Sequence, residues 1–181
     1  MYRSFRLSFL GDNLSVAFWE KLGEMFNLQE IFHIGIRVPN LYQAMEEMGE
    51  SLNVTWAEVV ESPGQRIWTP EHGQQEVPLK FVYSCEGPQH LELLEGAKGS
   101  FWDGSEDSGV HHLGVWVDDV KGETERLLAL GWDLLGSAKS PEEGYASMAY
   151  LAPPSGTIVE LVTSANKPRF ERWYAGGSFY D

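Results

Sequence analysis

A short phrase that occurs twice constrains the fold of this chain more than any other part of its sequence. The copies are Phe32-His33-Ile34-Gly35 and His111-His112-Leu113-Gly114, each with a histidine, an apolar residue and a glycine in a run with strand character. Each copy precedes a helix-like segment. Each half then reaches a strand with a central glutamate, Leu91-Glu92-Leu93 or Val159-Glu160-Leu161. The shared order indicates an internal repeat of a whole supersecondary unit.

The elements inside each half predict a β-α-β-β-β module, and hence an α+β fold. In the first half a strand at 31–38 is followed by a helix at 41–52, for which Asn40 is the natural N-cap. Further short strands follow, the last of them at 90–94. The polar stretch 70–78 is predicted to be a mobile loop. The second half repeats this order, with a strand at 110–117, a helix at 120–130 and a last strand at 157–163.

Segments outside the repeat divide the chain into three parts. Residues 1–29 form an N-terminal extension with an amphipathic helix predicted over 16–26, and residues 30–164 hold the two modules, at about 30–95 and 110–164. Residues 165–181 form an aromatic tail. Three placements of this tail are open: over a cleft, on its own subunit, or at the interface of a homodimer, because aromatic residues and arginine are enriched at interfaces.

Charge and cysteine content narrow the classes of partner. The chain has 181 residues and a formal net charge of −14, which argues against nucleic acid and anionic membrane as partners. It does not exclude an anionic small-molecule substrate, because a local cation can reverse the field in a cleft. The single cysteine, Cys85, excludes an internal disulfide, and the sequence shows neither a signal peptide nor a membrane span. These features predict a cytoplasmic protein.

Two histidines and two glutamates, delivered in the same order by the two halves, predict a metal site. A lone strand histidine is more often a packed core residue, and a lone glutamate between leucines often faces water. A charged residue flanked by apolar ones on both sides needs either solvent or a partner. The same pattern in both halves favours His33, Glu92, His112 and Glu160 as ligands of one divalent ion. Zn, Ni, Co, Mn and Fe(II) all suit such a set, which leaves coordination positions for water or substrate.

The remaining histidines receive other interpretations. His111 is aligned with Phe32 in the repeat, so we expect it to pack or to support a ligand rather than to bind the metal. His90 is two residues before Glu92 and should share its face of the strand, which makes it a candidate for substrate contact. His72, in the polar stretch, is expected to be solvated.

The chain resembles the vicinal oxygen chelate superfamily, which includes glyoxalase I, methylmalonyl-CoA epimerase, extradiol dioxygenases and bleomycin-resistance proteins. The resemblance rests on segments 32–40, 90–95, 110–120 and 156–162. It implies paired modules that form an open, incomplete barrel around a metal cleft. It also implies metal ligands at His33, Glu92, His112 and Glu160. The motifs are most similar to the epimerase and glyoxalase I branches, since the dioxygenase branch uses two histidines and one glutamate.

This resemblance implies a metal-dependent isomerase, epimerase or lyase that moves a proton next to a carbonyl through a metal-stabilised enolate. Glu160 and Glu92 would be the catalytic carboxylates. Glu71 and Glu76, in the polar stretch, are the alternative bases if the epimerase pattern holds.

Two other functions remain open at this point. One is a metal-independent small-molecule binding or resistance protein with an aromatic cleft formed by Trp56, Trp68, Trp102, Trp116 and Trp132. The other is an Fe(II) extradiol-type dioxygenase. The sequence does not identify the substrate.

Overall fold

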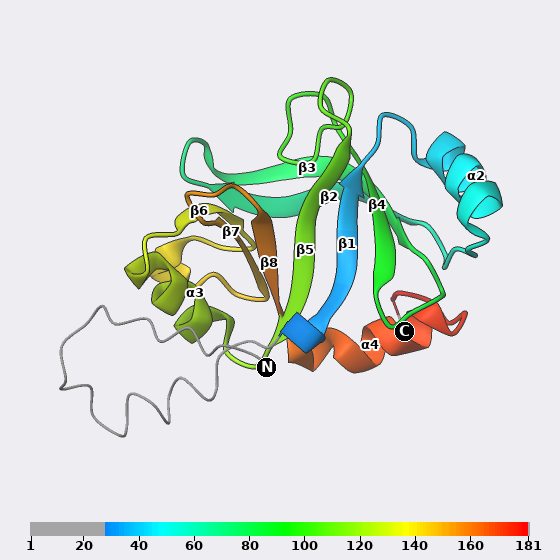
Figure 1. Cartoon of the computed structure of the whole chain (residues 1–181). Helices are drawn as coiled ribbons and strands as arrows, with labels where there is room; N and C mark the ends of the chain where they lie inside the picture. Colours follow the sequence, from blue (N-terminus) through cyan, green and yellow to red (C-terminus); the bar gives the residue numbers. More distant parts are fainter. Residues whose placement is uncertain (1–27, 181) are drawn as a thin grey trace, which may run out of the picture.

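The computed structural model of the chain describes residues 28–180, in which two similar modules close into one eight-stranded barrel (Figure 1). The helix predicted over 16–26 lies outside these residues. Within the described part, no helix is long and apolar enough to cross a membrane. A short 3-10 turn, Leu28–Glu30, leads into the first strand.

Each module has the predicted β-α-β-β-β order. The first contains β1 (Ile31–Arg37), α2 (Leu41–Leu52), β2 (Val60–Thr69), β3 (Gly73–Tyr83) and β4 (His90–Gly96). The second contains β5 (Gly109–Val117), α3 (Val120–Ala129), β6 (Asp133–Ser137), β7 (Met148–Ala152) and β8 (Ile158–Thr163). The expected α+β class and the tandem modules are confirmed.

Equivalent N-caps begin the two helices. The Asn40 side chain accepts a hydrogen bond from the Gln43 amide at 3.0 Å, and the Asp119 side chain accepts one from the Gly122 amide at 2.9 Å. Each satisfies an N–H that the first helical turn leaves without a partner.

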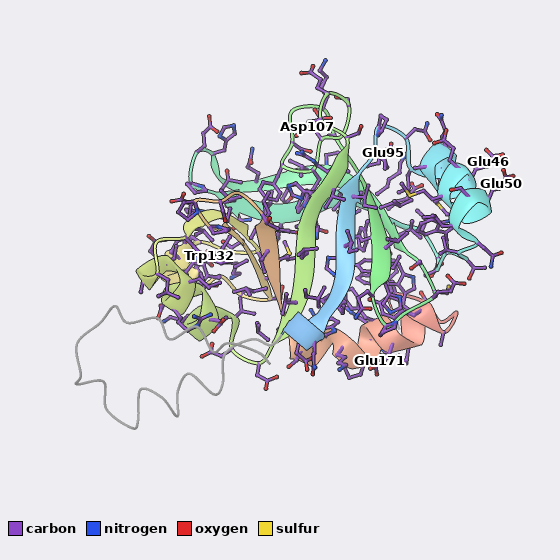
Figure 2. The ribbon with its side chains drawn as sticks, viewed as in Figure 1. Glu46, Glu50, Glu95, Asp107, Trp132 and Glu171 are labelled. Carbon is purple, nitrogen blue, oxygen red and sulfur yellow. The ribbon has the colours of Figure 1, made fainter. Side chains whose placement is uncertain are left out.

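The two helices cover opposite sides of the barrel (Figure 1). On α2, Leu41 is buried against Leu93 of β4, whereas Glu46 and Glu50 point away from the barrel (Figure 2). On α3, Leu127 is buried among apolar residues of β5, β7 and β8. The amphipathic pattern of each helix therefore fixes its apolar face against the strands of its own module.

The strand order around the barrel is β1-β4-β3-β2-β6-β7-β8-β5. The modules meet along the antiparallel pair β1–β5, and each of these strands is parallel to the last strand of its own module, β4 or β8. On the other side the modules meet where Trp68 of β2 pairs with Ser137 of β6. The expected open, incomplete barrel is therefore wrong, because this second junction closes it.

A long hairpin in the first module explains the closure. The stretch 70–78, predicted as a mobile loop, instead contains the tight turn between β2 and β3 and the first half of β3. β2 continues through Pro63-Gly64, with an irregularity in its pairing to β3 between Ser62 and Gln65. The extended hairpin carries Trp68 far enough along the sheet to reach β6.

The C-terminal segment folds back on the barrel. A 3-10 turn, Ser164–Asn166, leads into α4 (Lys167–Tyr174), which lies across one end of the barrel (Figure 1). Trp173 is fully buried, and its indole N–H donates to the Glu58 carbonyl at 2.9 Å. Phe170 packs edge-on against Phe32 and Tyr83.

Candidate metal centre

The glycine of each repeated phrase makes room for the histidine of the other. Across the β1–β5 ladder, His33 is paired with Gly114, and Gly35 is paired with His112. A Cβ at Gly114 would overlap the His33 ring, and a Cβ at Gly35 would overlap the His112 ring. The His-x-Gly spacing therefore places the two imidazoles side by side on one face of the barrel wall, edge-on at 85° with their ring centroids 4.9 Å apart.

The residue before each histidine is the extra residue of a β-bulge. Ladder pairing skips Phe32 on β1 and His111 on β5, so one residue is inserted into each strand next to the predicted ligand. Bulges re-aim neighbouring side chains. Both flanking rings then lie edge-on to the ligand ring, with Phe32 4.3 Å from His33 and His111 5.2 Å from His112 between centroids.

The glutamates come from the two parallel neighbours of the central pair. Glu92 on β4 is aligned with Gly35, and Glu160 on β8 is aligned with Gly114. Each glycine thus lies between a glutamate on one side and a histidine on the other. Leu93, which follows Glu92, packs outward beneath α2, as strand alternation requires.

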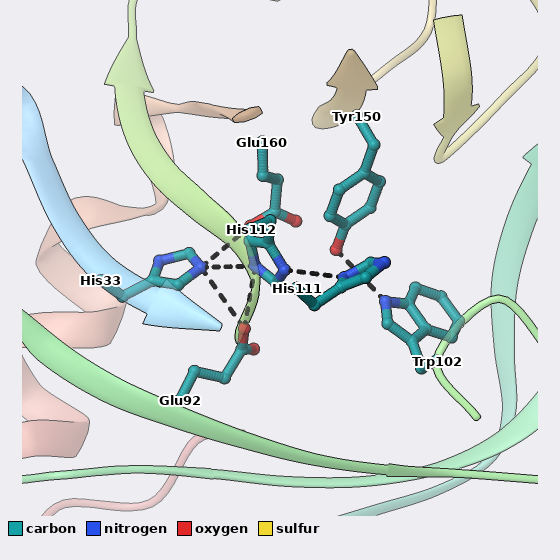
Figure 3. Close-up of polar contacts among 7 residues, drawn as sticks. All are labelled: His33, Glu92, Trp102, His111, His112, Tyr150 and Glu160. Carbon is teal, nitrogen blue, oxygen red and sulfur yellow. Dashed lines mark hydrogen bonds and ion pairs between the residues drawn. The ribbon is translucent and has the colours of Figure 1, made fainter. Parts of the chain in front are cut away.

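The structure brings the four predicted ligand residues together in the interior, and all four are buried (Figure 3). The Nε2 atoms of His33 and His112 are 2.8 Å apart. Glu92 Oε2 lies 3.3 Å from the first nitrogen and 3.1 Å from the second. Glu160 Oε2 lies 3.2 and 3.4 Å from the same two atoms.

This cluster fits a divalent ion. Ligand atoms about 2.1 Å from a common ion are separated by about 3.0 to 3.4 Å when they are adjacent in octahedral or tetrahedral geometry. The nitrogen–oxygen distances above fall in or close to this range. The two nitrogens and two carboxylate oxygens all lie within 4.8 Å of one another. A set of two imidazoles and two carboxylates could hold a borderline transition-metal ion.

Without an ion, the imidazoles and carboxylates of the cluster shift one another's pKa values. Burial opposes protonation of His112, but the carboxylates of Glu160 and Glu92 outweigh it and raise its pKa to about 9. The pKa of His33 is raised in the same way against burial. Burial favours the neutral acids, yet the histidines lower the pKa of both Glu92 and Glu160. The glutamates therefore favour positive charge on the histidines, and the histidines favour negative charge on the glutamates.

Two buried tyrosines, which the sequence interpretation missed, stand beside the glutamates. Tyr83 on β3 is paired with Glu92 across the β3–β4 ladder, and Tyr150 on β7 is paired with Glu160 across the β7–β8 ladder. Burial raises the pKa of both hydroxyls, and the neighbouring carboxylates of Glu92 and Glu160 raise it further. Trp102 donates to the Tyr150 hydroxyl at 3.4 Å. Aligning the two modules strand by strand would have revealed this second repeated pair.

His111 contacts His112, one of the four predicted ligands. Its Nδ1 is 3.0 Å from Nδ1 of His112 (Figure 3). Burial, together with the charges of His112 and Arg37, lowers the pKa of His111 to about 3. A neutral His111 can accept the Nδ1–H of His112, which directs the Nε2 lone pair of His112 toward the cluster.

The other sequence candidates lie elsewhere. His90 is buried, bonded to the Ser84 carbonyl at 2.7 Å and stacked on Tyr174, so it does not line the cavity. His72 is half-exposed in the β2–β3 turn, as expected for a solvated residue. Glu71 is 85% exposed in the same turn, and Glu76 pairs with Arg66 on the barrel surface at 3.0 Å. Neither loop glutamate faces the cluster.

A cavity of about 310 Å³ adjoins the glutamates. Strands of both modules and the C-terminal segment line it, with Glu92 and Glu160 at its wall. Its apolar surface comes largely from β-strand residues such as Phe81, and from aromatic residues of the C-terminal segment, Phe170 and Phe179. Of the five tryptophans proposed for an aromatic cleft, only Trp102 lines it.

Known structures share this fold. A hypothetical protein from Bacillus halodurans C-125 superposes with a TM-score of 0.56 at 20% identity, covering 74% of this chain and 93% of the other. Methylmalonyl-CoA epimerase from Mycobacterium tuberculosis superposes with a TM-score of 0.53 at 18% identity, covering 77% of this chain and 90% of the other. A variant of Streptomyces coelicolor methylmalonyl-CoA epimerase, in complex with 2-nitronate-propionyl-CoA, superposes with a TM-score of 0.52 at 24% identity. The match covers 75% of this chain and 94% of the other.

The sequence comparisons identify the family. No curated protein matches the chain. The sequence model of one family, described as the glyoxalase/bleomycin resistance protein/dioxygenase superfamily, matches residues 32–151, which is more than half of the chain. The chain therefore belongs to the glyoxalase/bleomycin resistance protein/dioxygenase superfamily.

Proposed function

We propose that this protein is a divalent-metal-dependent isomerase, epimerase or lyase that moves a proton on a carbon next to a carbonyl. The observation that carries the proposal is the convergence of four buried donor atoms, from His33, Glu92, His112 and Glu160, at the wall of a cavity. The fold shared with methylmalonyl-CoA epimerases supports an epimerase-type reaction.

The chemistry divides between the ion and the chain. A bound divalent ion would supply Lewis-acid stabilisation of negative charge on a substrate oxygen. Glu160 and Glu92 line the cavity and are the carboxylates available to take a proton from the carbon next to the carbonyl and return it. Tyr150 and Tyr83 stand beside these carboxylates, and the apolar walls of the cavity would exclude water from the reacting carbon. Because Glu71 and Glu76 lie on the surface, we assign them no role as base.

The first test is metal content. Purified protein dialysed against Zn²⁺, Ni²⁺, Co²⁺ or Mn²⁺ should retain about one ion per chain by elemental analysis. The Glu160→Gln and Glu92→Gln variants should retain much less, whereas Glu76→Gln, which removes a surface carboxylate of the first module, should bind as the wild type does. Failure of the wild type to bind any of these ions would refute the proposal.

The second test is proton exchange. Proton NMR in D₂O, with a panel of acyl-CoA thioesters and glutathione hemithioacetals, should show deuterium entering the carbon next to the carbonyl of at least one substrate. This exchange should disappear in Glu160→Gln. Oxygen uptake without deuterium entry would instead indicate dioxygenase chemistry.

The aromatic cavity supports a second candidate, a small-molecule binding or resistance protein. That function predicts ligand binding that survives complete removal of metal, with no turnover of the ligand. The two candidates thus differ in whether the four-residue cluster is needed.

A further inference from the structure

One positively charged side chain lines the cavity within the described part of the chain, and it comes from the C-terminal segment. Arg169 is on α4, beyond the family match to residues 32–151, and it lines the cavity together with Asn166. The other charged residues of the wall are Glu92 and Glu160. A cation placed there needs a partner or a function, because burial of an arginine without a counter-ion is unfavourable.

The guanidinium is held by aromatic rings rather than by an acid. Its central carbon is 4.5 Å from the ring centroid of Phe179 and 5.7 Å from that of Phe170, and both rings line the cavity. The buried Nε–H has no hydrogen-bond partner among the described residues. Burial and the neighbouring Arg172 lower the pKa of Arg169, and no carboxylate counters them.

These contacts leave one edge of the guanidinium available. Arginine recognises planar two-oxygen anions with two parallel N–H groups, and stacking on aromatic rings fixes the plane of that fork. A buried donor without a partner is unfavourable, and a ligand oxygen would give this Nε–H the hydrogen bond that it lacks. A carboxylate suits the site better than a phosphate, since one arginine balances one negative charge and the same wall already carries two glutamates.

We propose that Arg169 binds a carboxylate of the substrate, so that the protein acts on an organic acid. The inference rests on the proposed function only in identifying that carboxylate as part of the substrate. The cavity volume of about 310 Å³ suits a small acid or the acid-bearing end of a larger molecule. The segment outside the repeated modules thereby selects the substrate, while the modules supply the four-residue cluster.

The test compares two probes that differ in charge but hardly in shape, pentanoate and pentanamide. Protein stripped of metal and then freed of chelator by gel filtration is titrated with each, and binding is followed by tryptophan fluorescence and NMR. Wild type should bind pentanoate at least about tenfold more tightly than pentanamide. Lack of discrimination by the wild type would overturn the proposal without any variant.

Variants assign the effect to this residue. Arg169→Gln should abolish the preference, and Arg169→Lys should retain only part of it because lysine lacks the fork. Arg172→Gln removes the same charge from the exposed side of the same helix and should keep the full preference. Retention of the preference in a folded Arg169→Gln, or tighter binding of inorganic phosphate than of pentanoate, would refute a carboxylate site at Arg169.

This experiment is independent of the metal. The titrations use metal-free protein, so a wild type that never binds a divalent ion would refute the proposed function and leave the anion measurement valid. Conversely, a protein that binds the ion but shows no carboxylate preference in its metal-free form would refute the Arg169 assignment alone.

Discussion

The ring of His33 lies directly over Gly114, and the paired strands leave no room there for a Cβ. The equivalent contact joins His112 to Gly35. Each repeated phrase therefore contains one candidate ligand, its histidine, and a glycine that makes room for the histidine of the other phrase. The two halves of the site form only when the two modules pair.

Gly114→Ala should displace the His33 ring and weaken metal binding. Overpacking of a tight interior site costs typically about 1–3 kcal/mol, so we also expect a lower free energy of unfolding. Both effects can be measured by metal titration and urea denaturation. Gly64→Ala is a matched control, because a Cβ there meets only ordinary contacts with Glu76. Wild-type metal affinity in Gly114→Ala would contradict the geometry.

The metal-free protein should lose stability as the pH rises from about 6.5 to 9. The folded state raises the pKa of His112 from its ordinary value of 6.5 to about 9, so the stabilisation is complete below 6.5 and is lost as the pH rises through 9. An ion must displace this proton, so metal affinity should increase about tenfold per pH unit below 9 for each proton released.

Urea denaturation and Ni²⁺ titration across this pH range check both parts of that expectation. His72→Asn, which removes a half-exposed histidine, should follow the wild-type pH profile. Equal stability of the metal-free protein at pH 6.5 and 9 would show that His112 is not protonated in the cluster.

His111→Phe should fold, since Phe32 occupies the equivalent bulge position of the first module. It removes the acceptor for the His112 ring, and loss of such a supporting contact typically weakens metal affinity about 10- to 100-fold. His90→Phe removes another buried histidine that does not contact the cluster and should leave affinity unchanged. Unchanged affinity in His111→Phe would reduce His111 to a packing residue.

Tyr150→Phe should destabilise the protein by about 1–3 kcal/mol, because it leaves the buried Trp102 indole N–H without its acceptor. Tyr83→Phe removes the other buried hydroxyl beside the cluster, next to Glu92, and should also destabilise the protein. Tyr42→Phe, which removes an exposed hydroxyl bonded to Glu61, should change stability by less than about 0.5 kcal/mol. Urea denaturation measures the free energy of unfolding of the three variants. An equal loss in all three would show that the two buried hydroxyls have no special role in stability.

Local sequence patterns were sufficient for the modules. The helix at 41–52 was predicted with its N-cap, because the amphipathic period and the capping chemistry of Asn40 are encoded within a few residues. Strand alternation likewise suffices to put Glu92 on the face opposite Leu93, as the structure has it. The coincidence of histidine and glutamate in both halves then predicted which four residues would meet.

Pairing between distant segments decided the rest. The sequence alone determined a duplicated module and its candidate ligands, since periodicity and repeat order are local properties. Only the tertiary structure decided that Trp68 meets Ser137 and closes the barrel, that Tyr83 and Tyr150 stand beside the glutamates, and that Arg169 enters the cavity. Strand register and the docking of a terminal helix depend on the packing of residues far apart in the chain, which no local pattern specifies.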